Sequence, residues 1–344
     1  MILAGDVGGT KTLLGLFRRE GDRLRCIHEA SLPSGEYRSF GALLDAFLSP
    51  SGHARPRHAT IGVAGPVTGG RSRIVNLRWP VDARQLGRHL DTDDVRVIND
   101  LEATAWGIRE LPPRKLADLT PGVRSRPGNA ALIAAGTGLG TALLPWDGTR
   151  WRPHASEGGH QGFAPRDDVE VDLLRFLRRR HGRVSLERAL SGPALSALYE
   201  FFAGRARGCG FREARRRLAA ADDPNAEVAR RALAGEDETA DKALGLFVSI
   251  YGAAAGDLAL VAKATGGIYV GGGIAPRILP RLKDGAFVRA FRDKGRLTPL
   301  VERIPVRVIL EPRTALLGAA RHAATRSTTG RTVRTRPTRR KVNP

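Results

Sequence analysis

The feature that most restricts the fold of this chain is a short apolar segment that runs directly into a glycine turn. It occurs at 2–7, before Gly8-Gly9, and again at 130–135, before Gly136-Thr137-Gly138. A second apolar segment follows each turn, which is typical of a strand, a glycine turn and another strand. Two hairpins of the same shape predict two related α/β halves.

Strand and helix patterns alternate along the rest of the chain. A third apolar segment, 268–270, enters Gly271-Gly272-Gly273. The segment 169–180 has apolar residues at 169, 173, 174, 176 and 177 among others, so we expect a surface helix that buries this face. Further strands are predicted at 60–64, 95–98 and 306–310, and further helices at 101–110, 244–262 and 314–324. This alternation indicates an α/β protein.

The longest apolar stretch, 247–262, lies in a predicted core helix. Its apolar residues recur at helical spacing, and Gly252 and Gly256 permit close packing, which favours a core helix over a cofactor site. The stretch contains Asp257 and is too short to span a bilayer. We therefore expect no membrane contact.

Composition indicates a globular protein of a reducing compartment. At roughly 100–200 residues per domain, the length of 344 residues suggests two domains, and 42% hydrophobic residues suffice for a sizeable core. Cys26 and Cys209 stand far apart, which excludes a disulfide scaffold and a zinc ribbon. The first residues show no signal peptide. We expect a cytoplasmic location.

The net charge of +21 is concentrated in part at the C-terminus. Residues 326–344 contain six arginines and Lys341 without any acid, and their composition predicts a disordered, solvated tail. A nucleic-acid or polyanion contact is the less favoured interpretation, because no aromatic residue interleaves these bases and no recognition helix is evident.

The glycine turns predict a nucleotide site. Glycine amides can approach phosphate oxygens closely, hydroxyl side chains can donate to them, and Asp6 at a strand end could hold a hydrated Mg²⁺. Each turn alone could be a plain hairpin, but three of them at strand ends point to one nucleotide cleft. The predicted nucleotide ligands are Asp6, Gly8, Gly9, Thr10, Lys11, Thr12, Gly136, Thr137, Gly138, Gly272 and Gly273.

Polar residues suggest where a second substrate binds. Asn99 and Asp100 follow a predicted strand, where open α/β sheets place ligands, although Asp100 would also suit a helix N-cap. Glu157 and His160 flank a flexible turn in a pattern that suits hydrogen bonding to a polyol better than metal binding; a buried structural pair is the alternative. By itself, Glu187 could equally be a surface helix residue.

These motifs, in this order, resemble the bacterial glucokinases of the actin/hexokinase-type ATPase fold. The resemblance runs from Ile2 to about His322. It rests on Gly5-Asp6-Val7-Gly8-Gly9-Thr10, Ile98-Asn99-Asp100, Gly136-Thr137-Gly138-Leu139-Gly140, Glu157-Gly158-Gly159-His160, Leu190-Ser191-Gly192-Pro193 and Gly272-Gly273-Ile274. The related repressor/kinase (ROK) sugar kinases carry a cysteine-rich zinc motif after their Glu-x-Gly-His. This chain has no cysteine there, so the resemblance implies the zinc-free branch and no zinc site.

The resemblance implies an architecture. It is a two-domain actin/hexokinase-like ATPase fold with ribonuclease H-like halves and a helical insertion in the larger domain. A small α/β domain would span 1–110 and be completed by a C-terminal helix at 312–325. A large α/β domain would span 111–311, followed by the basic tail at 326–344. Relatives are commonly dimers, so we expect a homodimer.

The resemblance also implies a reaction and the roles of five residues. ATP would phosphorylate the 6-hydroxyl of D-glucose, with Mg-ATP in the interdomain cleft and Asp100 as general base. Asn99, Asp100, Glu157, His160 and Glu187 would bind the sugar. Residues 8–10 and 136–138 would hold the phosphates, and Gly272-Gly273 the adenosine side.

Three departures from the family pattern bear on sugar specificity more than on the reaction. Gly162 stands where an acid is frequent, Ser156 stands where a glycine is frequent, and 311–314 matches an Asn-containing turn loosely. A kinase for another hexose (mannose, fructose or an N-acetylhexosamine) and a non-catalytic sugar-sensing regulator on the same fold remain alternatives. An actin-like ATPase for a protein or acid substrate is disfavoured by the set Glu157, His160 and Glu187.

Overall fold

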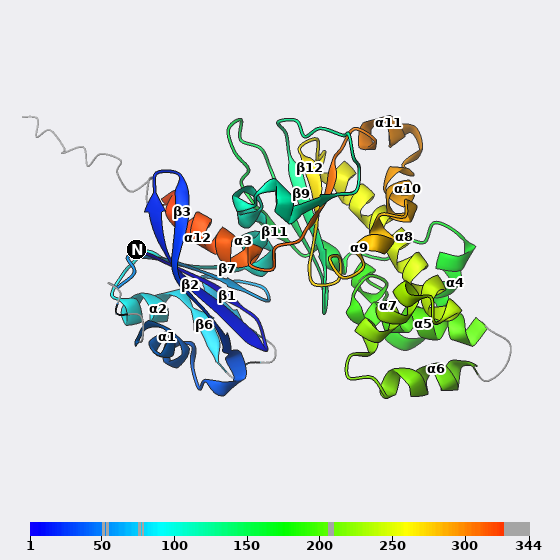
Figure 1. Ribbon diagram of the computed structural model, residues 1–344, viewed down its shortest axis with the longest axis horizontal. Coiled ribbons are helices and arrows are strands. Elements are labelled where there is room, and N and C mark those ends of the chain that lie inside the picture. Colours follow the sequence, from blue (N-terminus) through cyan, green and yellow to red (C-terminus); the bar gives the residue numbers. More distant parts are fainter. Residues whose placement is uncertain (50–51, 53–54, 75–76, 78, 206–209, 327–344) are drawn as a thin grey trace, which may run out of the picture. The chain divides into compact units, whose positions relative to one another are not determined.

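The chain forms two compact units (Figure 1). The computed structural model describes residues 1–49, 52, 55–74, 77, 79–205 and 210–326. Unit 1 consists of Met1–Ala103 with the chain from Leu316, and unit 2 of Thr104–Ala315. The limits predicted from the sequence, 110/111 and 311/312, differ from these by a few residues. Apart from its first residue, the predicted tail lies outside the described residues.

Unit 1 is built on a five-stranded sheet in the order β3-β2-β1-β4-β7. Strands β1 to β3 form an antiparallel meander, and β4 and β7 continue the sheet parallel to β1. The strands are β1 (Ile2–Val7), β2 (Lys11–Glu20), β3 (Arg23–Pro33), β4 (His58–Val63) and β7 (Val95–Asn99), with a separate ribbon of β5 (Arg71–Arg73) and β6 (Pro80–Asp82).

Helices cover both faces of this sheet (Figure 1). Alternate residues of β1 point to opposite faces. Leu3 joins a core that includes α1 (Phe40–Leu48) and α2 (Ala83–Leu90), while Ile2 joins a core with α12 (Thr314–Arg326). Helix α3 (Asp100–Gly107) follows β7 directly. The predicted strands and helices of this unit are therefore confirmed.

Unit 2 repeats the same strand arrangement. Its sheet has the order β11-β10-β9-β12-β13-β8, and again an antiparallel meander is continued by two parallel strands. The prediction of two related α/β halves is thereby confirmed. The strands are β8 (Leu116–Asp118), β9 (Ala130–Ala135), β10 (Leu139–Leu144), β11 (His154–Ser156), β12 (Gly267–Gly271) and β13 (Val306–Ile309).

Four helices between β11 and α8 form the helical insertion. They are α4 (Asp168–His181), α5 (Gly192–Arg205), α6 (Gly210–Ala219) and α7 (Pro224–Ala234). The predicted face of α4 is partly wrong, because Val169 is exposed and Glu170 lies fully buried beside Leu173 and Leu177.

The remaining helices of the described chain are short, apart from α8 (Glu238–Ala262). They are α9 (Leu279–Leu282), α10 (Ala286–Arg292) and α11 (Thr298–Val301), with 3₁₀ turns η1 (Ser34–Glu36), η3 (Ile108–Glu110), η4 (Pro113–Lys115), η5 (Gly158–His160), η6 (Leu186–Arg188) and η7 (Gly295–Leu297).

Helix α8 is the central helix of unit 2. It has 25 residues, so the prediction that its apolar stretch is too short to span a bilayer is wrong for the helix as a whole. By length and composition α8 could cross a membrane, but 61% of its most apolar window is buried inside the protein. A buried core helix has the same length and composition, and α8 packs in this way against α5, α7 and α10.

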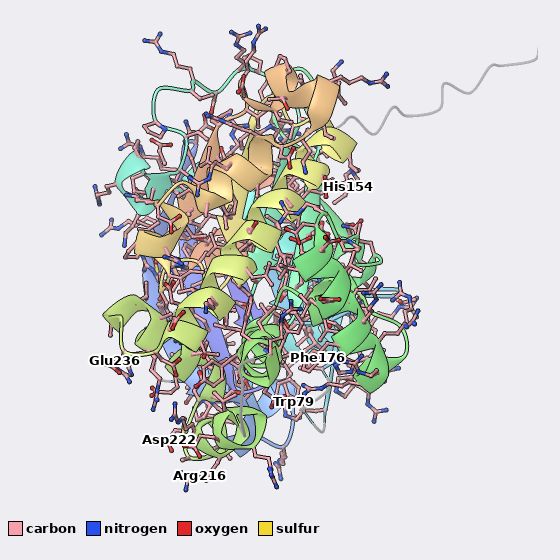
Figure 2. The ribbon with its side chains drawn as sticks, turned by 90° about the vertical axis from the view of Figure 1, so that its right-hand side faces the viewer. Trp79, His154, Phe176, Arg216, Asp222 and Glu236 are labelled. Carbon is pink, nitrogen blue, oxygen red and sulfur yellow. The ribbon has the colours of Figure 1, made fainter. Side chains whose placement is uncertain are left out.

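The surface of unit 2 carries many charged side chains (Figure 2). Local acids offset many of its arginines; Arg216, for example, lies 3.0 Å from Glu213, and Arg230 lies 2.8 Å from Glu236. Exposed pairs of this kind contribute only about 0–1 kcal/mol each. The arginine-rich composition therefore affects solvation more than it determines the fold.

Helix α8 supplies a matched test of close packing. A Cβ at Gly252 would overlap the carbonyl oxygen of Phe287 in α10, whereas one at Gly245 would meet only the end of the Arg281 side chain at 3.1 Å. We expect Gly252→Ala to lower the free energy of unfolding by about 1–3 kcal/mol through overpacking. Gly245→Ala should be neutral or stabilise by up to about 1 kcal/mol through helix propensity.

Urea denaturation of both variants checks this expectation. Equal changes in the two variants would contradict the close contact between α8 and α10.

Candidate active site

In unit 1, the sheet register brings two acids to neighbouring positions. Asp6 pairs with Gly62 of β4, and Gly62 pairs with Ile98 of β7, two residues before Asp100. A Cβ at Gly62 would lie 2.9 Å from the Cβ of Ala103, so the absence of a side chain there lets α3 begin directly over the sheet. The sequence analysis did not single out Gly62, because its role appears only when β4 and α3 are packed.

Asn99 caps helix α3. Its Oδ1 accepts hydrogen bonds from the amides of Leu101 (2.9 Å) and Glu102 (3.3 Å), and its Nδ2 donates to the carbonyl of Gly65 (3.1 Å). The alternative of Asp100 as N-cap is therefore replaced by a cap at Asn99, with Asp100 as the first helical residue. The Asn99 side chain also hydrogen-bonds Asp100, so the same residue caps the helix and helps to orient the acid.

The carboxyls of Asp6 and Asp100 have raised pKa values. Burial raises the pKa of Asp6 to about 6, and the charge of Lys11 opposes this rise. Burial also raises the pKa of Asp100 to about 6, and the nearby Asp6 adds to the effect, while hydrogen bonds such as that from the Leu101 amide (3.0 Å) oppose it. Two acids that disfavour each other's charge in a partly buried place are typical of functional sites.

Ser34 supports the first glycine turn. The Ser34 hydroxyl donates to the carbonyl of Gly8 (2.8 Å) and lies 2.9 Å from Oγ1 of Thr12, and both hydroxyl side chains are fully buried. This corrects the prediction for Thr12, whose hydroxyl is used inside the unit and is not available to a phosphate. Thr10 and Lys11 are exposed at the tip of the turn, beside the half-buried Gly9.

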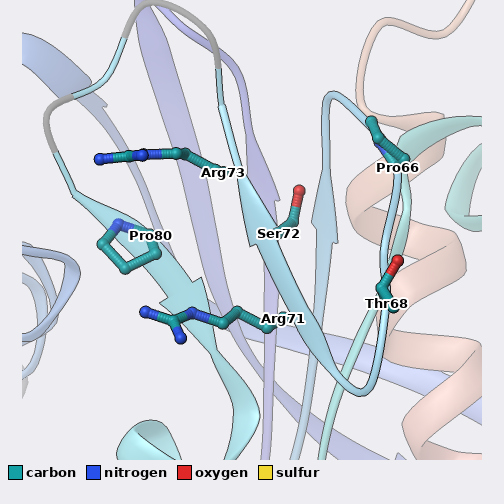
Figure 3. Close-up of a pocket in the computed structure, with 6 residues that line it drawn as sticks. All are labelled: Pro66, Thr68, Arg71, Ser72, Arg73 and Pro80. Atoms are coloured by element: carbon teal, nitrogen blue, oxygen red, sulfur yellow. The ribbon is translucent and has the colours of Figure 1, made fainter.

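Unit 1 has a pocket of about 580 Å³ at the ribbon of β5 and β6 (Figure 3). It begins one residue after Gly65, the partner of the Asn99 amide. Figure 3 shows the side chains of Arg71 and Arg73 extending from one side of β5, while the Ser72 hydroxyl points to the other side. The lining residues are Pro66, Thr68, Arg71, Ser72, Arg73 and Pro80, none of which the sequence analysis had singled out.

In unit 2, the second glycine turn holds Glu187. The amide of Gly136 donates to Gly138 (2.8 Å), and the amide of Leu139 donates to Oε2 of Glu187 (3.0 Å). A Cβ at Gly138 would lie 2.5 Å from the same oxygen. The glycine therefore leaves room for the Glu187 carboxylate to bond the end of the turn.

Three of the predicted nucleotide ligands line a pocket of about 370 Å³ within unit 2, namely Gly136, Thr137 and Gly273. The pocket size and its mixture of glycine backbone, apolar and polar side chains suit a small ligand such as a nucleoside. Gly192, Pro193 and Ile274 also line the pocket; they belong to the motifs 190–193 and 272–274, to which the sequence had given no ligand role. Asp223, Asn225, Arg277 and Ile278 line it as well, and no local motif marks them.

Tyr251 of α8 fixes the backbone under this pocket. Its buried hydroxyl accepts from the amide of Ala135 (3.1 Å) and lies 3.2 Å from the carbonyl oxygen of Gly271. Ala135 immediately precedes the second glycine turn, and Gly271 is the first residue of the third. Burial raises the pKa of Tyr251, so the hydroxyl stays neutral and can act as a hydrogen-bond donor. The core role predicted for this helix thus includes support of two predicted nucleotide segments.

The three predicted sugar ligands of unit 2 lie together. The His160 ring has Nε2 4.0 Å from a Glu157 oxygen and Nδ1 4.0 Å from a Glu187 oxygen. The exposed fractions of the side chains are 72% for Glu157, 57% for His160 and 26% for Glu187. The alternative of a buried structural pair is therefore wrong, and the groups are accessible to a ligand.

Backbone pairing between two distant segments creates this cluster. The amide of Phe163 donates to Val184 (3.1 Å), and the amide of Leu186 donates to Gln161 (2.8 Å). This pairing places η6, with Glu187, beside η5, with His160. Sequence spacing could not show that Glu187 belongs to the cluster, because the contact depends on these long-range bonds.

Ser156, one of the departures from the family pattern, is accommodated within the turn. Its hydroxyl accepts from the amide of Gly158 at 3.1 Å. Among the described residues, no cluster of three or more His, Cys, Asp or Glu could hold a metal ion.

Comparison with known proteins gives the family. The Glucokinase family matches residues 3–326. A glucokinase of Trichormus variabilis is 37% identical over 338 residues, which cover 94% of this chain and 99% of that protein. The crystal structure of a glucokinase from an Antarctic psychrotroph is 30% identical, with a TM-score of 0.82 over 94% of this chain and 98% of that chain.

A ROK-family glucokinase from Streptomyces griseus, in complex with glucose and AMPPNP, has a TM-score of 0.61 at 22% identity and covers 94% of this chain and 99% of that chain. This likeness concerns the fold. Together with the repeated sheet and its glycine turns, it defines a sugar kinase of the actin/hexokinase-like fold. Within that class, the chain belongs to the glucokinase family.

The raised pKa of Asp6 predicts a pH-dependent gain of stability on removing its charge. A carboxyl with a folded pKa of about 6, against 3.8 for the ordinary group, destabilises the fold fully above pH 6 and progressively less as the pH falls toward 4. Asp6→Asn should raise the free energy of unfolding at pH 7.5 by about 1–3 kcal/mol. At pH 5 the gain should be about half as large.

Denaturation in buffer without Mg²⁺ or nucleotide at the two pH values measures this difference. The control is Asp22→Asn, since the Asp22 side chain is fully exposed. A gain for Asp6→Asn that is the same at both pH values would show that burial of charge is not its cause.

Proposed function

We propose that this chain phosphorylates the 6-hydroxyl of glucose with ATP and that Asp100 is the general base. The family assignment supports the reaction, since the relatives are glucokinases. The position of Asp100 is the observation that carries its role. It stands at the carboxyl end of β7 and the start of α3, with a pKa of about 6. At neutral pH it is ionised, yet basic enough to accept the proton of a hydroxyl that attacks phosphorus.

Each unit offers hydrogen-bonding groups for a sugar. Unit 1 offers Asn99 and Asp100, and unit 2 offers Glu157, His160 and Glu187. Carboxylates accept from sugar hydroxyls, and the imidazole can donate or accept, so the set suits a polyol with several neighbouring hydroxyls. The 4.0 Å separations leave each group able to bond a ligand rather than its neighbour.

Each unit offers glycine backbone for a part of ATP. Residues 8–10 and 136–138 hold the phosphates, and Gly272-Gly273 with the pocket of about 370 Å³ holds the adenosine. Asp6 fits a hydrated Mg²⁺, because a divalent cation beside it would offset the burial that raises the Asp6 pKa. When bound, Mg²⁺ neutralises charge on the phosphates.

Two finer proposals concern the location and the oligomeric state of the protein. The protein acts in the cytoplasm, which the absence of any Cys-x-x-Cys or clustered cysteines suits. It forms a homodimer, as relatives commonly do.

The second candidate function is a kinase for another hexose. One observation favours it: Gly162 and Ser156 replace residues that are frequent beside the sugar ligands.

The decisive experiment is phosphoryl transfer from Mg-ATP to a panel of hexoses by wild type and by Asp100→Asn. The wild type should form glucose 6-phosphate, and the variant should lose about 10²–10⁴ in kcat because no base accepts the proton. Glucose should still bind the variant, as calorimetry would show.

Activity on another hexose alone would select the second candidate function. Near-normal turnover by Asp100→Asn would remove Asp100 from its proposed role, and glucose binding without transfer to any hexose would favour the sugar-sensing regulator.

The pH profile tests the same base independently. Below a pKa of about 6 the Asp100 carboxyl is protonated and cannot accept the hydroxyl proton. The value of kcat/KM for glucose should therefore fall about tenfold per pH unit below pH 6 and level off above pH 7. Initial rates between pH 5 and 8.5 at saturating Mg-ATP give the profile; a plateau that extends to pH 5 contradicts the assignment.

A further inference from the structure

A fully buried acid of unit 2 bonds the end of the segment that carries two of the proposed sugar ligands. Glu170 is in the first turn of α4, its exposed fraction is 0%, and its carboxylate is paired with Arg166. Oε2 accepts from the backbone amide of Arg166 at 3.0 Å and from Nε at 3.3 Å, and Oε1 accepts from Nη2. The same Nη2 donates to Oγ of Ser249 in α8 at 2.9 Å.

This pair ends the segment that carries two sugar ligands. From Glu157 to Arg166 the chain has no regular helix or strand beyond the short turn η5. Its middle is fastened by the bonds of Gln161 and Phe163 to the segment 184–186. Its far end is fastened by Arg166, which bonds Glu170 in α4 and Ser249 in the buried helix α8. The segment is thus stretched between two anchors, and Arg166 connects it to the core of the unit.

We propose that the Arg166–Glu170 pair positions Glu157 and His160 for glucose, so that Glu170 is a positioning residue for sugar binding. This inference rests on the proposed function, in which these two side chains bind the sugar. Arginine offers a planar set of donors, and the Glu170 carboxylate and the Ser249 hydroxyl fix that plane. The Arg166 backbone amide donates to the same carboxylate. Errors of about 1 Å in a positioned group can cost as much as 10²-fold in rate, so an anchor of this precision matters for a sugar site.

Physical chemistry separates this role from simple stabilisation. Burying an ion pair brings little net stability, and replacing both partners with apolar residues of similar size is often neutral or stabilising. An apolar pair would fill the same space but could not bond the Arg166 backbone amide or Ser249. A purely structural pair could therefore be replaced without loss of function, whereas a positioning pair could not.

The double variant Arg166→Met/Glu170→Met makes this test. We expect thermal unfolding close to that of wild type, a KM and Kd for glucose raised on the order of tenfold, and a KM for ATP changed by less than twofold. Glu170→Gln, which keeps the shape but removes the charge, should raise the same glucose constants. Calorimetric glucose binding without ATP gives a readout independent of turnover.

A second arginine–glutamate pair that includes α4 supplies a matched control. Glu200 of α5 pairs with Arg180 of α4 at 2.6 Å, away from the segment 157–166. Glu200→Gln should leave the glucose constants within twofold of wild type. Equal changes in glucose and ATP constants, or unchanged glucose constants in a folded double variant, would overturn the positioning role. Should the double variant not fold, Glu170→Gln and Arg166→Lys decide by the same glucose-against-ATP comparison.

The glucose affinity of Glu157→Gln, compared with that of wild type, distinguishes a failure of this inference from a failure of the proposed function. Loss of glucose affinity in Glu157→Gln, with normal affinity in the folded Glu170 variants, would leave the sugar site in place and refute the positioning role alone. Normal glucose binding by Glu157→Gln would refute the sugar site itself, and the inference with it.

Discussion

Close approach of backbone to neighbouring groups is the constraint on which the functional segments of both units depend. At Gly62 a Cβ would press against Ala103 and move the start of α3. At Gly138 it would press against the Glu187 carboxylate, and at Gly272 it would overlap the carbonyl of Ala135. At each of these glycines, the missing side chain allows a neighbouring segment to approach the backbone closely. A larger residue would displace α3, the Glu187 carboxylate or the end of β9, and so would change both the packing and the candidate site.

Hydroxyl groups buried in the core support the glycine turns from below. The Ser34 hydroxyl bonds the carbonyl of Gly8, and the Tyr251 hydroxyl links the ends of β9 and β12. A buried hydroxyl costs free energy unless it is hydrogen-bonded, so each is held in one orientation by its partners. The exposed turns consequently rest on rigid bonds within each unit, which is how a flexible glycine sequence can present a defined set of amides.

Local sequence patterns predicted those parts of the fold and site that depend on neighbours along the chain. The strand before Gly8, the strand before Gly136 and the helix after Asp100 are all read from hydrophobic period and turn residues within a few positions. The resemblance to a family then supplied Glu187, which no local pattern distinguishes from a surface residue. It joins His160 only through the pairing of 161–163 with 184–186.

The wrong predictions also arise because a local pattern does not show contacts with distant parts of the chain. Thr12 was predicted as a phosphate ligand because it follows a glycine turn, but strand alternation turns its side chain inward to Ser34. In α4, an apolar Val169 beside a charged Glu170 suggests the wrong buried position, since a helical pattern treats every charge as exposed. Arg166 reverses that expectation by satisfying the carboxylate inside the unit. Buried charge is therefore invisible to a hydrophobic pattern whenever its partner comes from outside the helix.

The two units solve the problem of holding polar groups in different ways. In unit 1 the acids proposed to act in the reaction are partly buried, and the structure bears the cost of their charge, which is visible in the pKa values of about 6 for Asp6 and Asp100. In unit 2 the proposed sugar ligands Glu157 and His160 are exposed, and the buried acid is Glu170 of helix α4. A base must have a raised pKa to accept a proton, whereas a hydrogen-bonding ligand needs only a fixed position. The depth of each acid thus follows from the chemistry it has to perform.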